Sequence, residues 1–196
     1  NYQDMLIATM GDTESSSKQS FKSAGYPDLE HSVVVGKNLI EGGLEWDEFI
    51  ELGHKTSDET LKEAAATVDP NKRMMIAYTS GTTGDPKGVV HSHIPIRNVA
   101  ERAQIFGLTC NDIHMSYLPL FHIYGFSEIT MTCVLTGACQ VLMDVFDAET
   151  VLDLASEKKA TILHGFEAHW LDLLNAQKRK PRELTIRFGT LPSGVE

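Results

Sequence analysis

The segment from Tyr78 to Val89 reads Tyr-Thr-Ser-Gly-Thr-Thr-Gly-Asp-Pro-Lys-Gly-Val and gathers glycines, hydroxyl side chains and one lysine. Glycines let the backbone turn tightly and direct its N–H groups toward an anion. The hydroxyl groups add hydrogen-bond donors, and Lys87 adds a mobile positive charge. This combination suits the phosphates of a nucleoside triphosphate.

Two other interpretations of the loop must be weighed. The usual phosphate loop of NTPases needs Gly, four residues, then Gly-Lys-Ser/Thr. Counting from Gly81, Pro86 stands where that pattern has its second glycine, so the usual loop is excluded. A Ser/Thr/Gly-rich surface turn has a similar composition. However, residues 73–78 predict a short buried strand before the loop and residues 94–106 predict a helix after it, and these flanks favour a phosphate site.

The whole stretch resembles the signature loop of the adenylate-forming superfamily, which contains acyl-CoA and aryl-CoA synthetases, luciferases and adenylation domains. Every fixed position of the form Tyr-Thr-Ser-Gly-Thr-Thr-Gly-x-Pro-Lys-Gly-Val is matched. The resemblance implies ATP-binding residues, which are Thr79, Ser80, Gly81, Thr82, Thr83, Gly84 and Lys87. It also implies that Thr82 or Thr83 contacts the Mg²⁺ of Mg-ATP, and that coenzyme A is a co-substrate.

A second motif, Leu118–Gly125, resembles the Leu-Pro-Leu-Phe-His-x-x-Gly segment of the same superfamily. Amino-acid-activating relatives typically carry aspartate at the position of His122, where it pairs with the substrate's ammonium group. Histidine is not a permanent anion, so the resemblance points to a carboxylic acid without an α-amine. We expect His122 and Tyr124 to line the acyl-substrate pocket, although a packed aromatic residue in the core remains an alternative for Tyr124.

The substrate class is less sharply indicated. Relatives often carry Val-Pro-Thr after a strand like that predicted over 160–165, whereas this chain has Phe166-Glu167-Ala168-His169-Trp170. This replacement either alters acyl selectivity or simply begins a surface helix. The general resemblance of Leu118–Gly125 and Ala160–Leu174 to fatty-acyl-CoA synthetases favours a fatty acid over an aryl acid.

Length and the order of motifs predict a piece of a larger enzyme. Superfamily members run to several hundred residues, against 196 here. The segment Thr185–Gly194 resembles the strand and turn whose glycine-rich continuation packs on adenine, which assigns Gly194 to the adenine side. The remaining parts of the active site lie later in the family, so we expect this piece alone to be inactive. A non-catalytic nucleotide-binding or interaction module is the hypothesis from a different class.

The composition narrows the class of protein further. Residues 1–70 carry 14 acidic and 5 basic residues, a net charge of −9, whereas residues 71–196 carry 13 and 12, a net charge of −1. Such an acidic balance argues against a nucleic-acid partner. No apolar run approaches the length of a transmembrane helix. The cysteines, Cys110, Cys133 and Cys139, lack CxxC spacing, so we expect reduced thiols rather than disulfides or zinc ligands.

The elements that position these motifs alternate between strands and helices. Before the loop we expect a helix tail over 2–9, a polar mobile loop over 11–20, a strand over 31–35 and helices over 44–52 and 57–66. Later strands are predicted over 73–78, 113–118, 139–143, 161–163 and 186–188, with helices over 95–107, 125–135, 148–158 and 168–177. The alternation predicts an α/β fold with a largely parallel sheet and helices on both faces.

The predicted organisation is an acidic part, 1–70, followed by an α/β part, 71–196, which carries the phosphate loop and the acyl pocket; together they would form one continuous, truncated domain. We predict an ATP-dependent acyl-CoA synthetase with a small carboxylic acid, ATP and CoA as partners. Its location would be cytoplasmic, with peripheral membrane attachment as the alternative. Exposed apolar surface on a truncated piece predicts a tendency to form homodimers or to aggregate.

Overall fold

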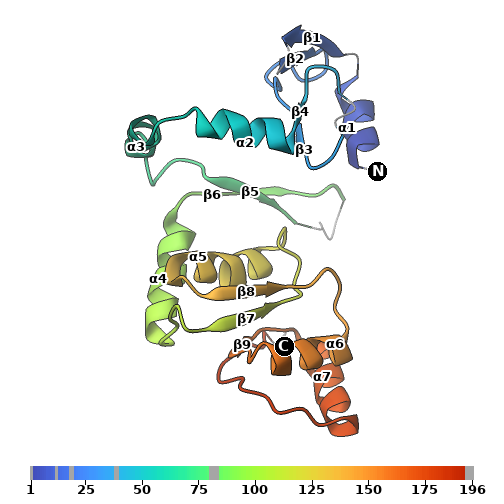
Figure 1. Cartoon of the computed structure of the whole chain (residues 1–196), viewed down its shortest axis with the longest axis vertical. Helices are drawn as coiled ribbons and strands as arrows, with labels where there is room; N and C mark the ends of the chain where they lie inside the picture. Colours follow the sequence, from blue (N-terminus) through green and yellow to red (C-terminus); the bar gives the residue numbers. More distant parts are fainter. Residues whose placement is uncertain (1, 12, 18–19, 38–39, 80–83, 193–196) are drawn as a thin grey trace. The chain divides into compact units, whose positions relative to one another are not determined.

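The computed structural model describes residues 2–11, 13–17, 20–37, 40–79 and 84–192. The chain divides into two compact units, Asn1–Val68 and Asp69–Glu196, drawn in Figure 1. Among the described residues, no helix combines the length and the apolar character that crossing a membrane requires.

The first unit is built from short elements around a small core. Its elements are α1 (Tyr2–Met10), β1 (Thr13–Ser17), β2 (Ser20–Ser23), β3 (Val33–Val34), β4 (Leu44–Glu45), α2 (Trp46–His54) and α3 (Asp58–Ala66). Strands β1 and β2 pair antiparallel, and β3 and β4 pair parallel. The core consists of Met10, Phe21 and Ile40, with Leu29 packed against them. Ser57 begins α3 as its N-cap by accepting a hydrogen bond from the Thr60 N–H.

The prediction of a polar mobile loop over 11–20 is wrong for the described part of that segment. Residues Thr13–Ser17 form a strand that pairs with Ser20–Ser23. Phe21 and Ser23 are buried on one face of this hairpin, and the Ser23 hydroxyl donates to the Met10 carbonyl at 2.8 Å. Burial of Phe21 therefore anchors a hairpin that the polar composition of the segment concealed.

The second unit contains a hairpin and a small parallel sheet. Its elements are β5 (Met75–Tyr78), β6 (Gly88–His91), α4 (Ile94–Ile105), β7 (Ile113–Ser116), η1 (Gly125–Met131), α5 (Thr132–Thr136), β8 (Cys139–Leu142), α6 (Ala148–Glu157), β9 (Ile162–Leu163) and α7 (Glu167–Arg179). Strands β5 and β6 pair antiparallel, whereas β7 lies between β8 and β9 and is parallel to both. The α/β fold and the parallel sheet are as predicted.

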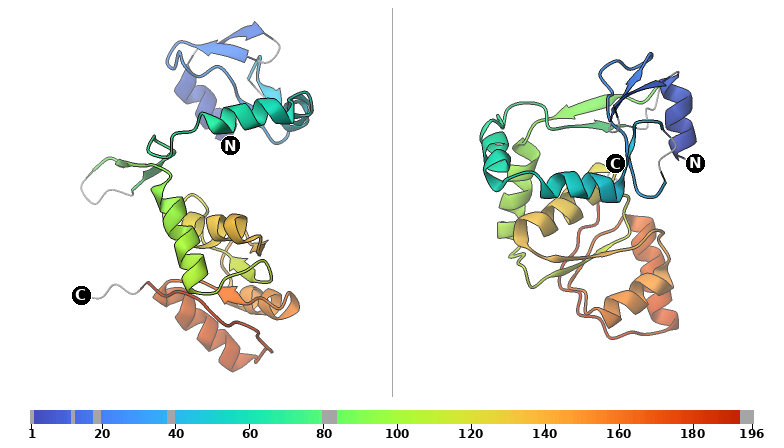
Figure 2. Two further views of the ribbon diagram at one scale, coloured as in Figure 1. Left: turned by 90° about the vertical axis from the view of Figure 1, so that its left-hand side faces the viewer. Right: turned by 45° about the horizontal axis from the view of Figure 1, so that its top comes forward.

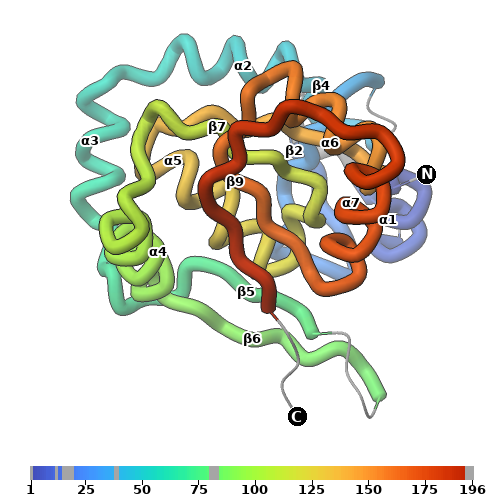
Figure 3. The backbone as a smooth tube through the Cα atoms, turned by 90° about the horizontal axis from the view of Figure 1, so that it is seen from below, coloured from blue at the N-terminus to red at the C-terminus, as the bar shows by residue number. Residues whose placement is uncertain are grey.

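Helices cover both faces of this sheet, as the two views in Figure 2 and the view from below in Figure 3 show. In Figure 3, α4 and α5 lie on one side of β7 and β9, and α6 and α7 lie on the other. The core between these layers includes Met115 from β7, Ile129 from η1, Val151 from α6 and Leu173 from α7. Each of these side chains is at most 3% exposed, so the sheet and its helices form one packed body.

Three elements of the second unit differ from the sequence-based prediction. Strand β6 was not anticipated, because Gly88–His91 lies next to the glycine-rich loop and carries no alternating pattern. The helix predicted over 125–135 begins as the π-helix η1 before it continues as α5. The strand predicted over 186–188 is reduced to a single parallel bridge between Ile162 and Phe188.

Candidate functional site

The predicted phosphate loop, residues 79–87, connects β5 and β6, which pair until Tyr78 faces Gly88. At the mouth of the loop, the Thr79 N–H donates to the Lys87 carbonyl at 3.0 Å. A Cβ atom on Gly88 would lie 2.9 Å from Ile76 Cγ2, so a larger residue would require the Ile76 side chain to shift. Gly84 has a φ of +147°, which L side chains rarely adopt.

The described ends of this loop are open to solvent. The side chain of Lys87 and residue Gly84 are exposed, so the lysine is free to approach an anion. Residues Ser80, Gly81, Thr82 and Thr83 lie outside the described part of the chain, as does Gly194 on the expected adenine side. The proposed contacts of these five residues therefore stay predictions.

The second motif continues directly from β7 and turns into η1. Gly125 is buried at this turn, where a Cβ atom would lie 2.5 Å from the Pro119 carbonyl oxygen and 3.1 Å from that of Leu118. Only glycine allows the motif to fold back on itself this closely. The π-helix that follows is a form that occurs frequently at functional sites.

His122 is exposed, and its ring is oriented by the main chain. The Tyr124 N–H donates to His122 Nδ1 at 3.2 Å, so in the neutral ring Nε2 carries the proton. An Nε2–H group that points away from this contact is a donor suited to a carboxylate oxygen. The Phe166 ring lies edge-on to His122, with ring centroids 6.2 Å apart.

Tyr124 is half-buried and joins the motif to two other segments. Its hydroxyl lies 2.6 Å from the Thr190 hydroxyl, and its ring centroid lies 5.2 Å from that of Phe166 and 6.1 Å from that of His164. Burial raises the pKa of the Tyr124 phenol, so this group stays protonated and remains a hydrogen-bond donor near neutral pH.

These rings belong to a larger set, which we call the aromatic cluster: Tyr117, His122, Tyr124, Phe146, His164, Phe166 and His169. Tyr117 contacts Phe146 and His169 at centroid distances of 4.9 and 5.3 Å, and Phe166 contacts His169 at 5.8 Å. The cluster therefore brings together segments that are separated by more than forty residues in the sequence.

A cavity of about 360 Å³ adjoins the cluster at the carboxyl ends of β7 and β8. Its lining contains Tyr117 of the cluster and the first half of the second motif: the full set is Ser116, Tyr117, Leu118, Pro119, Leu120, Phe121, Leu142, Met143 and Asp144. In open parallel sheets, ligands bind at this end of the strands. The second motif thus lines a cavity with one half and enters the aromatic cluster with the other.

Sequence reasoning missed Tyr117, Phe146 and His164, and treated Phe166 and His169 only as part of a departure from the family pattern. Tyr117 directly follows β7, and His164 directly follows β9. A polar or aromatic residue directly after a buried parallel strand was therefore the signal that could have identified both, because such ends meet at one edge of the sheet.

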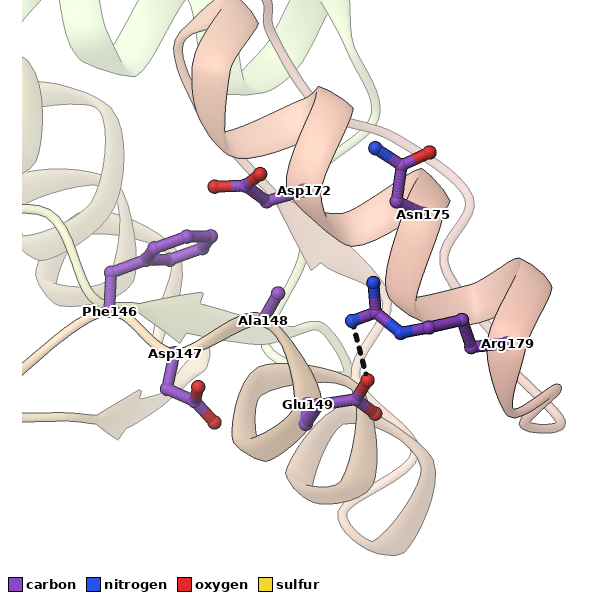
Figure 4. Close-up of a pocket in the computed structure, with 7 residues that line it drawn as sticks. All are labelled: Phe146, Asp147, Ala148, Glu149, Asp172, Asn175 and Arg179. Carbon is purple, nitrogen blue, oxygen red and sulfur yellow. Dashed lines mark hydrogen bonds and ion pairs between the residues drawn. The ribbon is translucent and has the colours of Figure 1, made fainter.

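A second cavity, of about 300 Å³, lies between α6 and α7 and is shown in Figure 4. Its lining is polar and includes Asp147 and Glu149 from the start of α6 and Asp172 and Arg179 from α7. Glu149 and Arg179 pair across it at 2.8 Å. This cavity contains Phe146 from the aromatic cluster but none of the site residues expected from the sequence, all of which lie elsewhere or outside the described ranges.

Comparison with known sequences shows one family whose match includes both motifs. The AMP-binding enzyme family matches residues 6–193. YngI of Bacillus subtilis (strain 168), provisionally named an acyl-CoA synthetase, is 32% identical over 196 residues, which are 100% of this chain and 35% of that protein. The medium-chain fatty-acid–CoA ligase of Escherichia coli (strain K12) is 33% identical over 142 residues, 71% of this chain and 25% of the ligase. The chain thus spans about a third or less of the length of these relatives.

Solved structures give the same picture. The anthranilate CoA ligase AuaEII, in complex with anthranoyl-AMP, superposes with a TM-score of 0.69 at 27% identity, over 85% of this chain and 32% of that chain. ATP-bound MatB from Rhodopseudomonas palustris superposes with a TM-score of 0.51 at 27% identity, over 59% of this chain and 24% of that chain. The N-terminal domain of FACL13 from Mycobacterium tuberculosis superposes with a TM-score of 0.62 at 23% identity, over 79% of this chain and 39% of that chain. At this identity the comparison shows a similar fold alone.

Proposed function

The chain belongs to the AMP-binding enzyme family, and from this premise we propose that the complete gene product is an ATP-dependent acid–thiol ligase. It activates a carboxylic acid as acyl-AMP and transfers the acyl group to coenzyme A. We propose a fatty acid as the favoured substrate class. The proposed location is cytoplasmic, or peripheral at a membrane.

The observation that supports this proposal most is the phosphate loop. All of its fixed positions agree with the adenylate-forming pattern, and its ends are held together by the bond from the Thr79 N–H to the Lys87 carbonyl. We propose that Thr79, Gly84 and Lys87 act with residues 80–83 as the ATP site, and that Gly194 lies against adenine. Mg²⁺ enters with the nucleotide as Mg-ATP, with Thr82 or Thr83 as its proposed contact.

In the first half-reaction, a carboxylate oxygen of the acid attacks the α-phosphorus of ATP, and pyrophosphate leaves. The negative charge of the departing pyrophosphate must be stabilised, and loop N–H groups, hydroxyls and the Lys87 ammonium are the donors for that task. The exposed, unbranched lysine side chain can follow the phosphates as they move. In the second half-reaction, the thiol sulfur of coenzyme A attacks the acyl carbon, and AMP leaves.

Orientation of the acid is assigned to His122. Its Nδ1 is occupied by the Tyr124 N–H, which leaves the Nε2–H to donate to one carboxylate oxygen and aim the other toward phosphorus. The apolar part of the acid would lie against Tyr124 and Phe166, and the cavity lined by Leu118, Leu120 and Met143 offers further apolar surface for a chain.

An aryl acid is the second candidate, and one observation favours it. Rings of His122, Tyr124 and Phe166 meet within 6.2 Å at their centroids, and edge-on or tilted rings stabilise a flat aromatic guest. The likeness to AuaEII, named as an anthranilate CoA ligase, is consistent with this alternative.

The test measures pyrophosphate release from ATP by the complete gene product with panels of fatty and aryl acids, with and without coenzyme A. We expect acid-dependent release, a thioester product when coenzyme A is present, and a loss of about a hundredfold or more in kcat for Lys87→Ala. The acid with the highest kcat/KM decides between the fatty and the aryl class.

Lys178→Ala is the matched control, because Lys178 is an exposed lysine on α7, apart from the loop in the sequence and from the aromatic cluster. This variant should retain wild-type turnover. No release with any acid would contradict the ligase proposal and favour a non-catalytic nucleotide-binding module. Equal activities of Lys87→Ala and wild type would contradict the assignment of the loop.

A further inference from the structure

Three segments that are distant in sequence meet at the hydroxyl of Thr190. Thr190 Oγ1 lies 2.6 Å from the Tyr124 hydroxyl and 2.8 Å from Nδ1 of His164. Thr190 follows the Ile162–Phe188 bridge, His164 follows β9, and Tyr124 stands at the start of η1. The Thr190 hydroxyl therefore contacts both side chains.

The direction of these hydrogen bonds follows from a backbone group. The Thr190 N–H donates to His164 Nδ1 at 3.2 Å, so Nδ1 is an acceptor and the neutral ring carries its proton on Nε2. The Thr190 hydroxyl must then donate its own hydrogen to Nδ1. Having done so, Oγ1 is an acceptor for the Tyr124 O–H, which lies 2.6 Å from it and 3.0 Å from a second acceptor, the main-chain carbonyl of Thr190. The chain of donation runs from Tyr124 through Thr190 to His164.

His164, the last acceptor in this series of hydrogen bonds, is held in place by its surroundings. His164 is 1% exposed, and its main-chain carbonyl accepts a hydrogen bond from the Tyr117 hydroxyl at 2.5 Å. Burial lowers the pKa of His164 to about 3, so the ring stays neutral and Nδ1 keeps its lone pair at neutral pH. The main chain of Thr190 is also fixed, because its carbonyl accepts the Gly165 N–H at 3.2 Å.

Tyr124 connects Thr190 and His164 to the candidate pocket. Its ring packs on Phe166, whose ring in turn lies edge-on to His122, the residue assigned to the carboxylate. Hydrogen bonds at the hydroxyl end favour the one ring orientation that forms this wall. A free phenol at the same place would sample several orientations, and each would change the shape offered to an acid.

We infer that Thr190 and His164 are positioning residues, which fix the Tyr124 ring as a wall of the acid-binding pocket and thereby set the affinity for the carboxylic acid substrate. This inference rests on the proposed function. Neither residue contacts the acid; both act through Tyr124. Their loss should therefore change how the acid binds and leave the ATP site unchanged.

The experiment compares steady-state kinetics of Thr190→Val and Thr190→Ser in the complete gene product. Valine keeps the shape of threonine but has no hydroxyl, whereas serine keeps the hydroxyl. We expect Thr190→Val to raise KM for the preferred acid about fivefold, with kcat and KM for ATP changed less than about twofold. Thr190→Ser should restore the wild-type KM.

Two further variants separate positioning from general damage. Thr185→Val removes a hydroxyl from the same segment, where it donates to the Ala160 carbonyl at 2.9 Å, and should leave KM for the acid unchanged. Tyr124→Phe removes the donor and should raise KM at least as much as Thr190→Val does. Tyr124→Phe also loses the bond to the Thr190 main-chain carbonyl, so it already removes the contact that Thr190→Val breaks, and the double variant Tyr124→Phe/Thr190→Val should show no increase beyond that of Tyr124→Phe.

The outcomes are distinct. An active wild-type enzyme whose Thr190→Val variant keeps its KM, or fully additive effects in the double variant, would overturn the inference and leave the proposed function standing. An inactive wild type would overturn both. If Thr190→Val does not fold, Tyr124→Phe against Thr185→Val gives the decision, since an unchanged KM in Tyr124→Phe overturns the inference.

Discussion

At the scale of single residues, the second unit contains two buried histidines whose pKa values are lowered. His114 in β7 is 0% exposed and His164 is 1% exposed, and their rings stack with centroids 6.0 Å apart. Within the described part of the chain, both nitrogens of His114 and Nε2 of His164 have no hydrogen-bond partner. Burial lowers the pKa of His114 to about 4 and that of His164 to about 3, because charged imidazolium is poorly solvated in the core.

This depression of both pKa values predicts acid lability. Below pH 6.5 the unfolded chain binds protons that the folded chain does not, so the free energy of unfolding falls as pH falls toward 4. The loss is about 1.4 kcal/mol per pH unit for each histidine. Urea denaturation at a series of pH values measures it, in a Trp46→Phe background where Trp170 fluorescence reports the second unit alone.

His114→Gln removes one titrating group and should reduce the pH dependence by about half. His54→Gln is the control, because His54 is exposed in the last turn of α2 and belongs to the first unit. The measured quantity is the slope of the free energy of unfolding against pH. A loss of stability that is the same at every pH does not change this slope. Parallel curves for His114→Gln and the wild type would contradict the prediction.

At the scale of elements, Asp112 ties three segments together at the start of β7. Its carboxylate accepts hydrogen bonds from Arg187 Nη2 at 2.6 Å, from the Thr161 hydroxyl at 2.7 Å and from the Thr109 N–H at 2.9 Å. Burial alone would raise the pKa of this carboxyl group, but the bonds from Arg187, Thr109 and Thr161 outweigh it and lower the pKa to about 2. Asp112 thus joins β7 to the residues that flank β9 and the bridge at Phe188.

Asp112→Ala should therefore destabilise the second unit. Asp112 is 3% exposed, and its removal leaves the Thr161 hydroxyl and the Thr109 N–H without their acceptor. Since the Arg187 side chain is 43% exposed and solvent screens it, we expect a loss of about 2 kcal/mol in the free energy of unfolding.

Glu101→Ala supplies the comparison for this variant. It breaks the pair between Arg97 and Glu101 on α4, whose side chains are 74% and 59% exposed. Exposed pairs contribute little, so this variant should change the free energy of unfolding by less than about 0.5 kcal/mol. Equal effects of the two variants in urea denaturation would argue against a structural role for Asp112.

At the scale of the whole molecule, the β5–β6 hairpin is a two-stranded sheet with apolar side chains in solvent. Ile76, Tyr78 and Val90 are 54%, 72% and 51% exposed. In the described part of the chain, neither edge of this sheet pairs with a further strand. Short exposed sheets of this kind associate readily with other copies through their edges and apolar faces.

We therefore predict that the 196-residue chain self-associates as its concentration rises. Sedimentation velocity over a wide concentration range measures this. The double variant Ile76→Thr/Val90→Thr, which keeps strand-forming side chains but reduces apolar area, should shift the chain toward monomer. Val35→Thr is the control, because Val35 is 83% exposed but lies in the first unit. A wild-type chain that stays monomeric at every concentration would refute the prediction.

The sequence by itself determined the family, the order of most strands and helices in the second unit, and the position of the predicted phosphate loop after a strand and before a helix, but not the strand β6 that follows the loop directly. These features are local: apolar periodicity depends on neighbouring residues, and a loop that binds phosphate needs its glycines, hydroxyls and lysine within one short stretch. His122 and Tyr124 could be predicted as site residues for the same reason, because one contiguous motif carries both.

Only the tertiary structure decided which residues lie next to His122 and Tyr124. Tyr124, His164 and Thr190 meet because parallel strands align their carboxyl ends, and no local pattern encodes that meeting. Gly125 is required at the start of η1 because a Cβ atom there would lie 2.5 Å from the Pro119 carbonyl oxygen, and the hairpin at Thr13–Ser23 follows from the burial of Phe21. In each case the deciding free energy comes from packing between distant segments, which a one-dimensional pattern does not contain.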